Sequence, residues 1–226
     1  MNALFQASAR IEAFRAGSLR RTVADMEQAF RGAEKSRIPA LLQQSGITLD
    51  LVLAALLIKR HSRQINEIIH AVGLLTALPC ILEKGESVES LSVAAGNTGK
   101  GFDLETNKRI AEFTFIQWQG GSEVVRHNKV FKDFFFLAEA DTKKARELYT
   151  IGTEHPTKFF NSNRALLPIV DGNRKLGEAF RNKYGTSFPR VRDYYSPRQH
   201  LVTIRDVTEH IPILKAQPAD QPQSTR

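Results

Sequence analysis

Two carboxylates nine residues apart, Asp103 and Glu112, have the types and the spacing that favour chemistry. Residues 101–105 alternate apolar and acidic side chains, and residues 110–118 are rich in aromatic and β-branched ones, which is typical of strands. Adjacent antiparallel strands can bring two carboxylates onto one face, where their like charges require a cation or a basic neighbour. Magnesium is commonly held by such carboxylates, and we predict that this pair binds Mg²⁺ or Mn²⁺. The alternative is a pair of surface carboxylates that form ion pairs with Lys108 or Arg109.

The elements before this pair are predicted to be helical. Apolar residues recur every three to five positions over the first forty residues, and Pro39 interrupts the pattern. The pattern predicts two packed helices, over residues 49–60 and 63–77. Thr48 is expected to cap the first of them, and residues 49–58 are expected to be buried. Because this apolar run is shorter than the roughly 18 residues that indicate a membrane span, we expect no membrane segment.

A change of pattern after Gly85 predicts a sheet. Residues 91–118 are typical of a three-stranded meander, residues 122–139 of an amphipathic helix, residues 148–152 of a fourth strand and residues 157–170 of a further helix. The predicted fold class is therefore α/β, with a small central mixed β-sheet flanked by helices. We expect an N-terminal helical extension over residues 1–60, an α/β core with a basic C-terminal region over residues 61–211, and a flexible tail over residues 212–226.

The core resembles the PD-(D/E)XK nuclease superfamily, which includes restriction endonucleases and repair nucleases. The resemblance rests on the order helix, three-strand meander, helix, strand, helix over residues 63–170, and on two segments: Gly101-Phe102-Asp103-Leu104-Glu105 and Arg109-Ile110-Ala111-Glu112-Phe113-Thr114-Phe115-Ile116. It implies a restriction-endonuclease-like fold and metal-dependent hydrolysis of phosphodiester bonds, with Asp103 and Glu112 as metal ligands. An acidic residue on the helix before the meander sometimes joins them in that superfamily, and Glu67 stands at the corresponding place.

The sequence departs from that pattern two residues after the predicted glutamate ligand, where the superfamily has a lysine that positions and activates the attacking water. Thr114 occupies this position and carries no charge. Superfamily members are known to supply the cation from another element. Lys129 or Lys132 on the predicted helix could do so here, and Gln117 is a polar substitute nearer the strand. The alternative is a catalytically degenerate core that acts as a nucleic-acid-binding or partner-binding protein.

Surplus positive charge favours a polyanionic partner. The chain carries 32 Lys and Arg against 24 Asp and Glu, which gives a formal net charge of +8. Residues 171–205 contain eight basic and three acidic residues, with aromatic side chains between them, although such a surface can also simply cover an aromatic core. Because basic side chains bind phosphates and aromatic rings stack on unpaired bases, we predict a nucleic acid, DNA, as the partner. The residues predicted to contact it are Arg126, Lys175, Arg181, Lys183, Arg190 and Arg192.

Other classes of function find no support in the sequence. A single cysteine, Cys80, excludes an internal disulfide and a multi-cysteine zinc site, and its apolar surroundings predict that it is buried. The sequence contains no nucleophile elbow, zinc-protease motif or dinucleotide-binding fingerprint. We expect a cytoplasmic protein, since a free thiol and no visible export signal favour that compartment. A homodimer or a partner subunit could form through the N-terminal helices.

Overall fold

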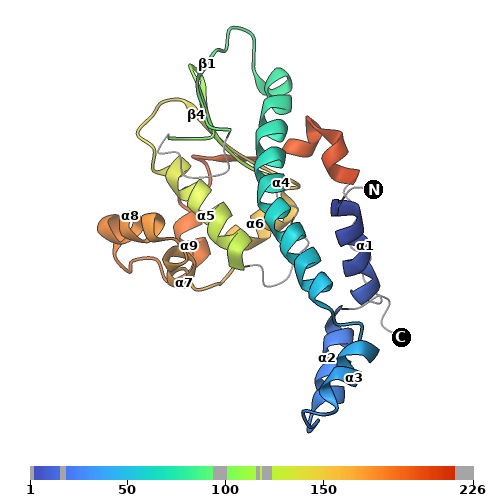
Figure 1. The fold of residues 1–226 in the computed structure, drawn as a ribbon. Helices are drawn as coiled ribbons and strands as arrows, with labels where there is room; N and C mark the ends of the chain where they lie inside the picture. The colour runs from blue at the N-terminus through green and yellow to red at the C-terminus, as the bar shows by residue number, and fades with distance from the viewer. Residues whose placement is uncertain (1–2, 16–18, 94–100, 116–117, 119–123, 217–226) are drawn as a thin grey trace. The chain divides into compact units, whose positions relative to one another are not determined.

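The computed structural model describes residues 3–15, 19–93, 101–115, 118 and 124–216 (Figure 1). The chain divides into two compact units, Met1–Asn66 and Glu67–Arg226. The N-terminal unit contains α1 (Ala3–Arg15), α2 (Leu19–Phe30), α3 (Ile38–Gln44) and the first part of α4 (Leu49–Ile81). The C-terminal unit contains the rest of α4 and the strands described below.

Local signals in the sequence explain where the N-terminal helices begin. Pro39 lies in the first turn of α3, where its missing N–H forfeits no hydrogen bond, so it starts this helix. Thr48 caps α4 as predicted, since its Oγ1 accepts a hydrogen bond from the Leu51 amide at 3.2 Å. The N-terminal unit buries few apolar side chains. Among its described residues, the buried ones are Ala7, Leu41 and Ala54.

The helix α4 corrects several predictions. It is one helix rather than two, because the Ser62 hydroxyl donates to the Lys59 carbonyl oxygen at 2.8 Å within the helix instead of ending it. Most apolar residues near its start are not buried: Leu49 and Leu53 keep 83% and 62% of their area exposed, although Ala54 is buried. Cys80, near its end, is also exposed. By length and composition α4 is a candidate to cross a membrane, a criterion that core helices of soluble proteins also meet.

A five-stranded mixed sheet in the order β1-β2-β3-β4-β5 forms the centre of the C-terminal unit. Its strands are β1 (Val88–Leu91), β2 (Leu104–Thr106), β3 (Arg109–Thr114), β4 (Ala145–Thr150) and β5 (Thr203–Asp206). The pairs β1–β2 and β2–β3 are antiparallel, which confirms the predicted meander, and β3–β4 and β4–β5 are parallel. The first strand lies earlier than predicted, and β5 is not foreseen by the sequence pattern.

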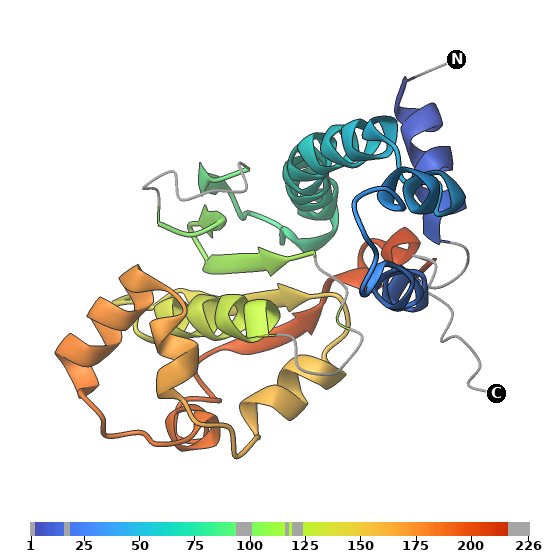
Figure 2. The ribbon, with the colours of Figure 1, turned by 60° about the horizontal axis from the view of Figure 1, so that its bottom comes forward.

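Helices cover both faces of this sheet, as predicted, because the side chains along β3 alternate in direction. Ala111 and Phe113 belong to a hydrophobic cluster with the C-terminal part of α4. Ile110 points to the opposite face and packs in a second cluster with α5 (Val124–Ala138), which lies across the sheet in Figure 2. By the same alternation, Glu112 and Thr114 lie on the α5 face.

A glycine lets α4 approach the sheet closely. A Cβ atom on Gly73 would lie 2.8 Å from the Phe115 ring, so a larger residue would push helix and ring apart. His70 lies one helical turn earlier and packs against the same ring, edge to face, with the ring centroids 5.9 Å apart. The close approach at Gly73 therefore fixes where His70 stands beside the sheet.

The remaining helices lie on the α5 side of the sheet (Figure 2), and their aromatic side chains pack with those of α5. They are α6 (Glu154–Phe160), α7 (Leu167–Asp171), α8 (Arg174–Tyr184) and α9 (Val191–Tyr195). The single helix predicted over residues 157–170 is wrong, because Pro168 in the first turn of α7 favours a new start. Two 3₁₀ turns, η1 (Val207–Glu209) and η2 (Pro212–Ala216), follow β5.

Candidate active site

Asp103, the residue directly before β2, lies opposite Glu112 of β3. The register pairs Leu104 with Ala111, so one further step along each chain sets Asp103 against Glu112. Directly opposed side chains of an antiparallel pair share one face of the sheet. The Phe113 amide donates a hydrogen bond to Asp103 Oδ2 at 2.9 Å and fixes this carboxylate at the strand end. The structure thus brings the two predicted carboxylates together.

The basic residues between these carboxylates have other partners. Lys108 Nζ lies 3.1 Å from Glu83 Oε2, and Arg109 Nε lies 2.7 Å from Glu86 Oε1. The alternative raised by the sequence, surface ion pairs of the two carboxylates with these neighbours, is therefore not what the described residues form. The positive charge beside the carboxylate pair comes from helices instead.

The helix α5 supplies a lysine to the pair. Lys129 Nζ lies 2.6 Å from Asp133 Oδ2 and 3.4 Å from the Phe113 carbonyl oxygen. Burial alone would lower the pKa of Lys129, but three neighbouring carboxylates, Asp133 foremost and then Glu112 and Asp103, raise it above its usual value. Lys129 therefore stays protonated, so it can stabilise negative charge but does not serve as a base.

Glu112 lies among too many negative charges. Burial raises the pKa of its carboxyl group well above the usual value, and the carboxylates of Asp133 and Asp103 raise it further against the opposing effect of Lys129. Burial also acts to raise the pKa of Asp103, but His70 and a backbone amide outweigh it, so this pKa lies below its usual value. Glu112 therefore holds its proton to a higher pH than an ordinary glutamate does.

Two residues at this site are not predicted by the sequence analysis. His70 on α4 places its Nε2 atom 3.5 Å from Asp103 Oδ1, and this buried nitrogen has no hydrogen-bond partner in the described part of the chain. Asp133 on α5 is completely buried, and its Oδ1 atom also makes no hydrogen bond there. Helical spacing could have indicated both, since His70 follows Glu67 by one turn and Asp133 follows Lys129 by four residues.

The other predicted catalytic and metal-binding residues lie as follows. Glu67 is exposed on α4, whereas His70 one turn later reaches Asp103. Lys132 Nζ lies 3.4 Å from Asp133 Oδ1, so it approaches the site through that carboxylate. Gln117 lies outside the described residues. Of the two lysines considered, the structure therefore brings Lys129 to the carboxylate pair.

The donor set fits a divalent cation such as Mg²⁺ or Mn²⁺. Three carboxylates surround one lysine, and carboxylate oxygens are ligands that both ions prefer. The raised pKa of Glu112 indicates a shortage of positive charge at this site. Across the described ranges, no three His, Cys, Asp or Glu side chains are already grouped as a metal centre. Binding would therefore require the carboxylates to turn from their present partners.

The basic residues predicted to contact DNA are partly neutralised within the fold. Four of the six have an acidic or carbonyl partner: Arg181 with Asp171, Lys183 with Glu139, Arg190 with the Asn163 carbonyl oxygen and Arg192 with Asp193. Lys175 Nζ lies 5.5 Å from the centroid of the Phe136 ring, and Arg126 is half-buried near the start of α5. These contacts reduce the positive field that residues 171–205 can offer to phosphates.

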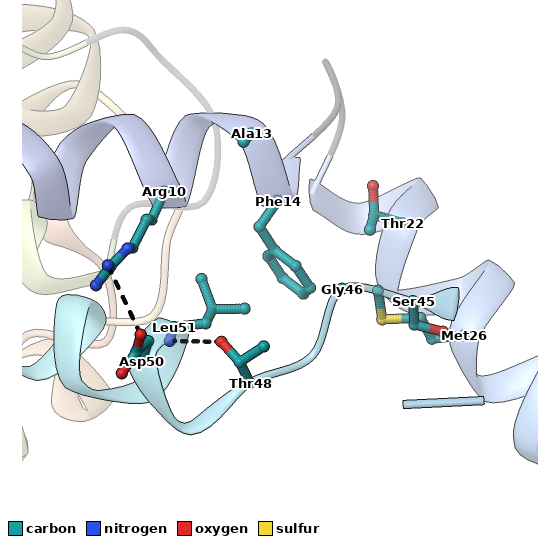
Figure 3. Close-up of a pocket in the computed structure, with 10 residues that line it drawn as sticks. All are labelled: Arg10, Ala13, Phe14, Thr22, Met26, Ser45, Gly46, Thr48, Asp50 and Leu51. Atoms are coloured by element: carbon teal, nitrogen blue, oxygen red, sulfur yellow. Dashed lines mark hydrogen bonds and ion pairs between the residues drawn. The ribbon is translucent and has the colours of Figure 1, made fainter. Parts of the chain in front are cut away.

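A separate pocket lies in the N-terminal unit (Figure 3). It has a volume of about 440 Å³ and is bordered by α1, α2 and the start of α4, with Phe14 and Leu51 among its walls. Arg10 Nη2 and Asp50 Oδ2 form an ion pair 3.6 Å apart on one side, with more than half of each side chain exposed. Because its charged side chains neutralise each other in solvent, this pocket offers weaker grounds for chemistry than the carboxylate pair.

Comparisons of the chain with protein-family models, with curated proteins and with solved structures find no match. The resemblance drawn from the sequence therefore stays a prediction. The function of the site has to be argued from its own geometry and charge.

Proposed function

We propose that the protein is a metal-dependent nuclease that hydrolyses phosphodiester bonds of DNA on a restriction-endonuclease-like core. The observation that carries this proposal is the closeness of Asp103, the residue before β2, to Glu112 on β3, with the Lys129 ammonium group acting on both. The element order supports it, because an antiparallel meander followed by a helix and a parallel strand is the order that the resemblance implies.

Each side chain has a distinct role in this proposal. Asp103 and Glu112 would hold Mg²⁺ or Mn²⁺, and His70 lies where it could add a nitrogen ligand. When bound, the ion polarises the scissile phosphate and lowers the pKa of the attacking water. Lys129 stabilises the negative charge that develops on the phosphate. Glu112 loses its proton on binding, since a carboxylate ligand must be deprotonated.

The charge on α5 supports a nucleic acid as the substrate class. Arg126, Lys129 and Lys132 recur at intervals of three residues, so they follow one side of this helix. The side of α5 that supplies the lysine to the carboxylate pair is therefore also basic. Contacts of this kind hold a phosphate backbone without reading its sequence.

Metal binding and cleavage test the proposal. Calorimetric titration with Mn²⁺ and incubation of supercoiled plasmid DNA with Mg²⁺ or Mn²⁺ use the full chain and its Asp103→Ala and Glu112→Ala variants. We expect each variant to lower the cleavage rate by about 10³-fold, because the ion contributes several kcal/mol to transition-state stabilisation. Glu105→Ala is the matched control, since Glu105 lies two residues after Asp103 and pairs with Lys144 instead.

Two results contradict the proposal. If both alanine variants cleave plasmid DNA as fast as the wild type, these carboxylates are not the site. If the wild-type chain neither binds Mn²⁺ nor cleaves, the core is not a metal-dependent nuclease.

A degenerate core that only binds nucleic acid is the second candidate. Two observations favour it: Thr114 stands where the superfamily has its lysine, and the described carboxylates are not yet grouped as a metal centre. This candidate predicts affinity for DNA that falls steeply with salt, together with no metal-dependent cleavage. Measuring DNA binding by fluorescence anisotropy at two salt concentrations, beside the cleavage assay, separates the two candidates.

A further inference from the structure

Thr114 and Lys129 meet at one carboxylate. Thr114 Oγ1 lies 3.3 Å from Asp133 Oδ2, and Lys129 Nζ lies 2.6 Å from the same oxygen. Asp133 is completely buried between the strand β3 and its own helix. Asp133 therefore links Thr114, which stands where the superfamily has its lysine, to Lys129 on α5.

We propose that Asp133 is a positioning residue that fixes the Lys129 ammonium group beside Glu112, with Thr114 steadying Asp133 from the strand. This inference rests on the proposed nuclease function and specifies how the site obtains its cation from α5. A positive charge at position 114 or at position 129 would lie next to the same carboxylate, that of Asp133.

The need for such a residue follows from the length of the lysine side chain. A lysine side chain has several rotatable bonds whose freedom is lost when it is ordered, and its ammonium group can donate in many directions. The short contact to Asp133 and the longer one to the Phe113 carbonyl oxygen define a single place for this group. Because 33% of the Lys129 side-chain area is exposed, the side chain has a route to solvent once that contact is lost.

Thr114 has a matching role on the strand. Its hydroxyl donates to the oxygen that also accepts from Lys129, so it restricts the rotation of the Asp133 carboxylate. A lysine at position 114 would start from the same face of β3 and could reach the same buried acid. The arrangement therefore predicts that the charge can be moved from helix to strand as long as Asp133 is present.

The first experiment measures the position of Lys129 without any reference to cleavage. The full chain is reductively methylated with formaldehyde and borohydride, and the modification of each lysine is followed by peptide mass spectrometry. We expect Lys129 to react at least about tenfold more slowly than the exposed Lys143 in the same sample, because it is held by a charged hydrogen bond. Asp133→Asn keeps the size of the side chain and removes its charge, and it should abolish most of this protection.

The second experiment measures the consequence for the reaction. On a DNA oligonucleotide with Mg²⁺, Asp133→Asn should lower kcat by about 10-fold to 100-fold and change KM by less than about twofold, because a misplaced group affects the transition state more than binding. Lys129→Thr should lower kcat by about 100-fold or more, as expected for the loss of an electrostatic stabiliser. The control Lys143→Thr should leave kcat and KM unchanged.

Moving the lysine from position 129 to position 114 shows whether Asp133 positions the ammonium group or only stabilises the fold. Thr114→Lys combined with Lys129→Thr should recover at least about tenfold of the kcat lost in Lys129→Thr. The same exchange in an Asp133→Asn background should recover nothing. If Asp133 only stabilises the fold, Asp133→Asn loses kcat only in proportion to the unfolded fraction seen by circular dichroism. The combination of Thr114→Lys with Lys129→Thr then recovers the same kcat whether residue 133 is Asp or Asn.

The outcomes separate this inference from the proposed function. A wild-type chain that cleaves, with an unchanged kcat in Asp133→Asn, overturns the role of Asp133 and leaves the nuclease in place. Equal methylation of Lys129 and Lys143 in the wild type overturns the positioning itself, whatever the chain cleaves. A wild-type chain with a protected Lys129 that cleaves nothing overturns the proposed function instead.

Discussion

Two charged clusters lie on the same sheet and differ in their balance of charge. The balanced cluster joins two carboxylates to two guanidinium groups and a tyrosine: Glu86, Glu147, Arg109, Arg205 and Tyr149. The acidic cluster gathers three carboxylates, Asp103, Glu112 and Asp133, around Lys129, with Lys132 and His70 at longer distances of 3.4 Å and 3.5 Å from Asp133 and Asp103. In the first, Arg109 lies 2.7 Å from oxygens of both carboxylates, and Arg205 lies 2.7 Å from the other oxygen of Glu147. In the second, Asp133 has Lys129 at 2.6 Å, but Glu112 forms no ion pair with a described residue.

The pKa values of the carboxyl groups record this difference. Burial acts to raise the pKa of Glu86, but hydrogen bonds led by the one from Arg109 lower it to about 2. Glu147 also has a lowered pKa, because Tyr149 and the two guanidinium groups outweigh its burial. Glu112 shows the opposite, a pKa raised by burial and by its acidic neighbours. Buried carboxylates with full partners hold a fold together, whereas those short of positive charge are suited to receive a cation.

Removing Arg109 should have the largest effect. Arg109→Met keeps most of the volume but leaves Glu86 and Glu147 with less compensation in a buried place, and we expect a loss of about 3–5 kcal/mol in the free energy of unfolding. Urea unfolding of the full chain measures it. Arg174→Met is the control, since this side chain is 93% exposed and its loss should change stability by less than about 0.5 kcal/mol. Equal losses of stability in the two variants would show that Arg109 does not stabilise the buried carboxylates of Glu86 and Glu147.

A divalent cation should stabilise the fold through the acidic cluster. At a Mn²⁺ concentration about 100 times Kd, the free energy of unfolding should rise by about 2.7 kcal/mol if the ion binds only the folded chain. The rise should vanish in Asp103→Ala and persist in Glu105→Ala, because Glu105 already has a lysine partner. Thermal unfolding with and without Mn²⁺ measures it. A rise that survives in Asp103→Ala would place the ion elsewhere.

The sequence predicts the acidic cluster better than the balanced one, for a physical reason. Asp103 lies directly before β2 and Glu112 lies on β3, and a tight turn joins these two strands, so extending the register by one residue is enough to set the side chains face to face. The mixed sheet and its two helical layers follow from similar local patterns, and the structure confirms them. Lys129 was one of two candidates, because helical spacing places Lys132 on the same side of α5.

Contacts between distant segments could not be predicted in this way. Arg109 reaches carboxylates 23 and 38 residues away, and no periodic pattern in one sequence encodes such pairs. His70 stands beside Asp103 because Gly73 lets α4 approach Phe115, which is a matter of packing rather than spacing. The strand β5 was missed for the same reason, since it pairs with a strand more than fifty residues earlier in the chain.

The smallest effect concerns the pH dependence of stability, and it should have opposite signs in the two clusters. In the unfolded chain Glu112 ionises near its ordinary pKa of 4.5, whereas in the folded chain it holds its proton to a higher pH. The wild type therefore loses stability as the pH rises above 4.5, by up to about 1.4 kcal/mol per pH unit, until Glu112 ionises in the folded state too. Glu112→Gln removes this loss, so its advantage over the wild type should grow as the pH rises.

Glu86 gives the reverse pattern. Its folded pKa of about 2 lies below its ordinary value, so its contribution to stability is present above pH 4.5 and is lost as the pH falls toward 2. Glu86→Gln should therefore be most destabilising near neutral pH and least destabilising in acid. Urea unfolding of the wild type and both variants from pH 2.5 to pH 8, without divalent ions, measures the two differences. If both differences follow pH in the same direction, the two clusters do not differ in charge balance, and the argument for a cation at Asp103 and Glu112 loses its electrostatic support.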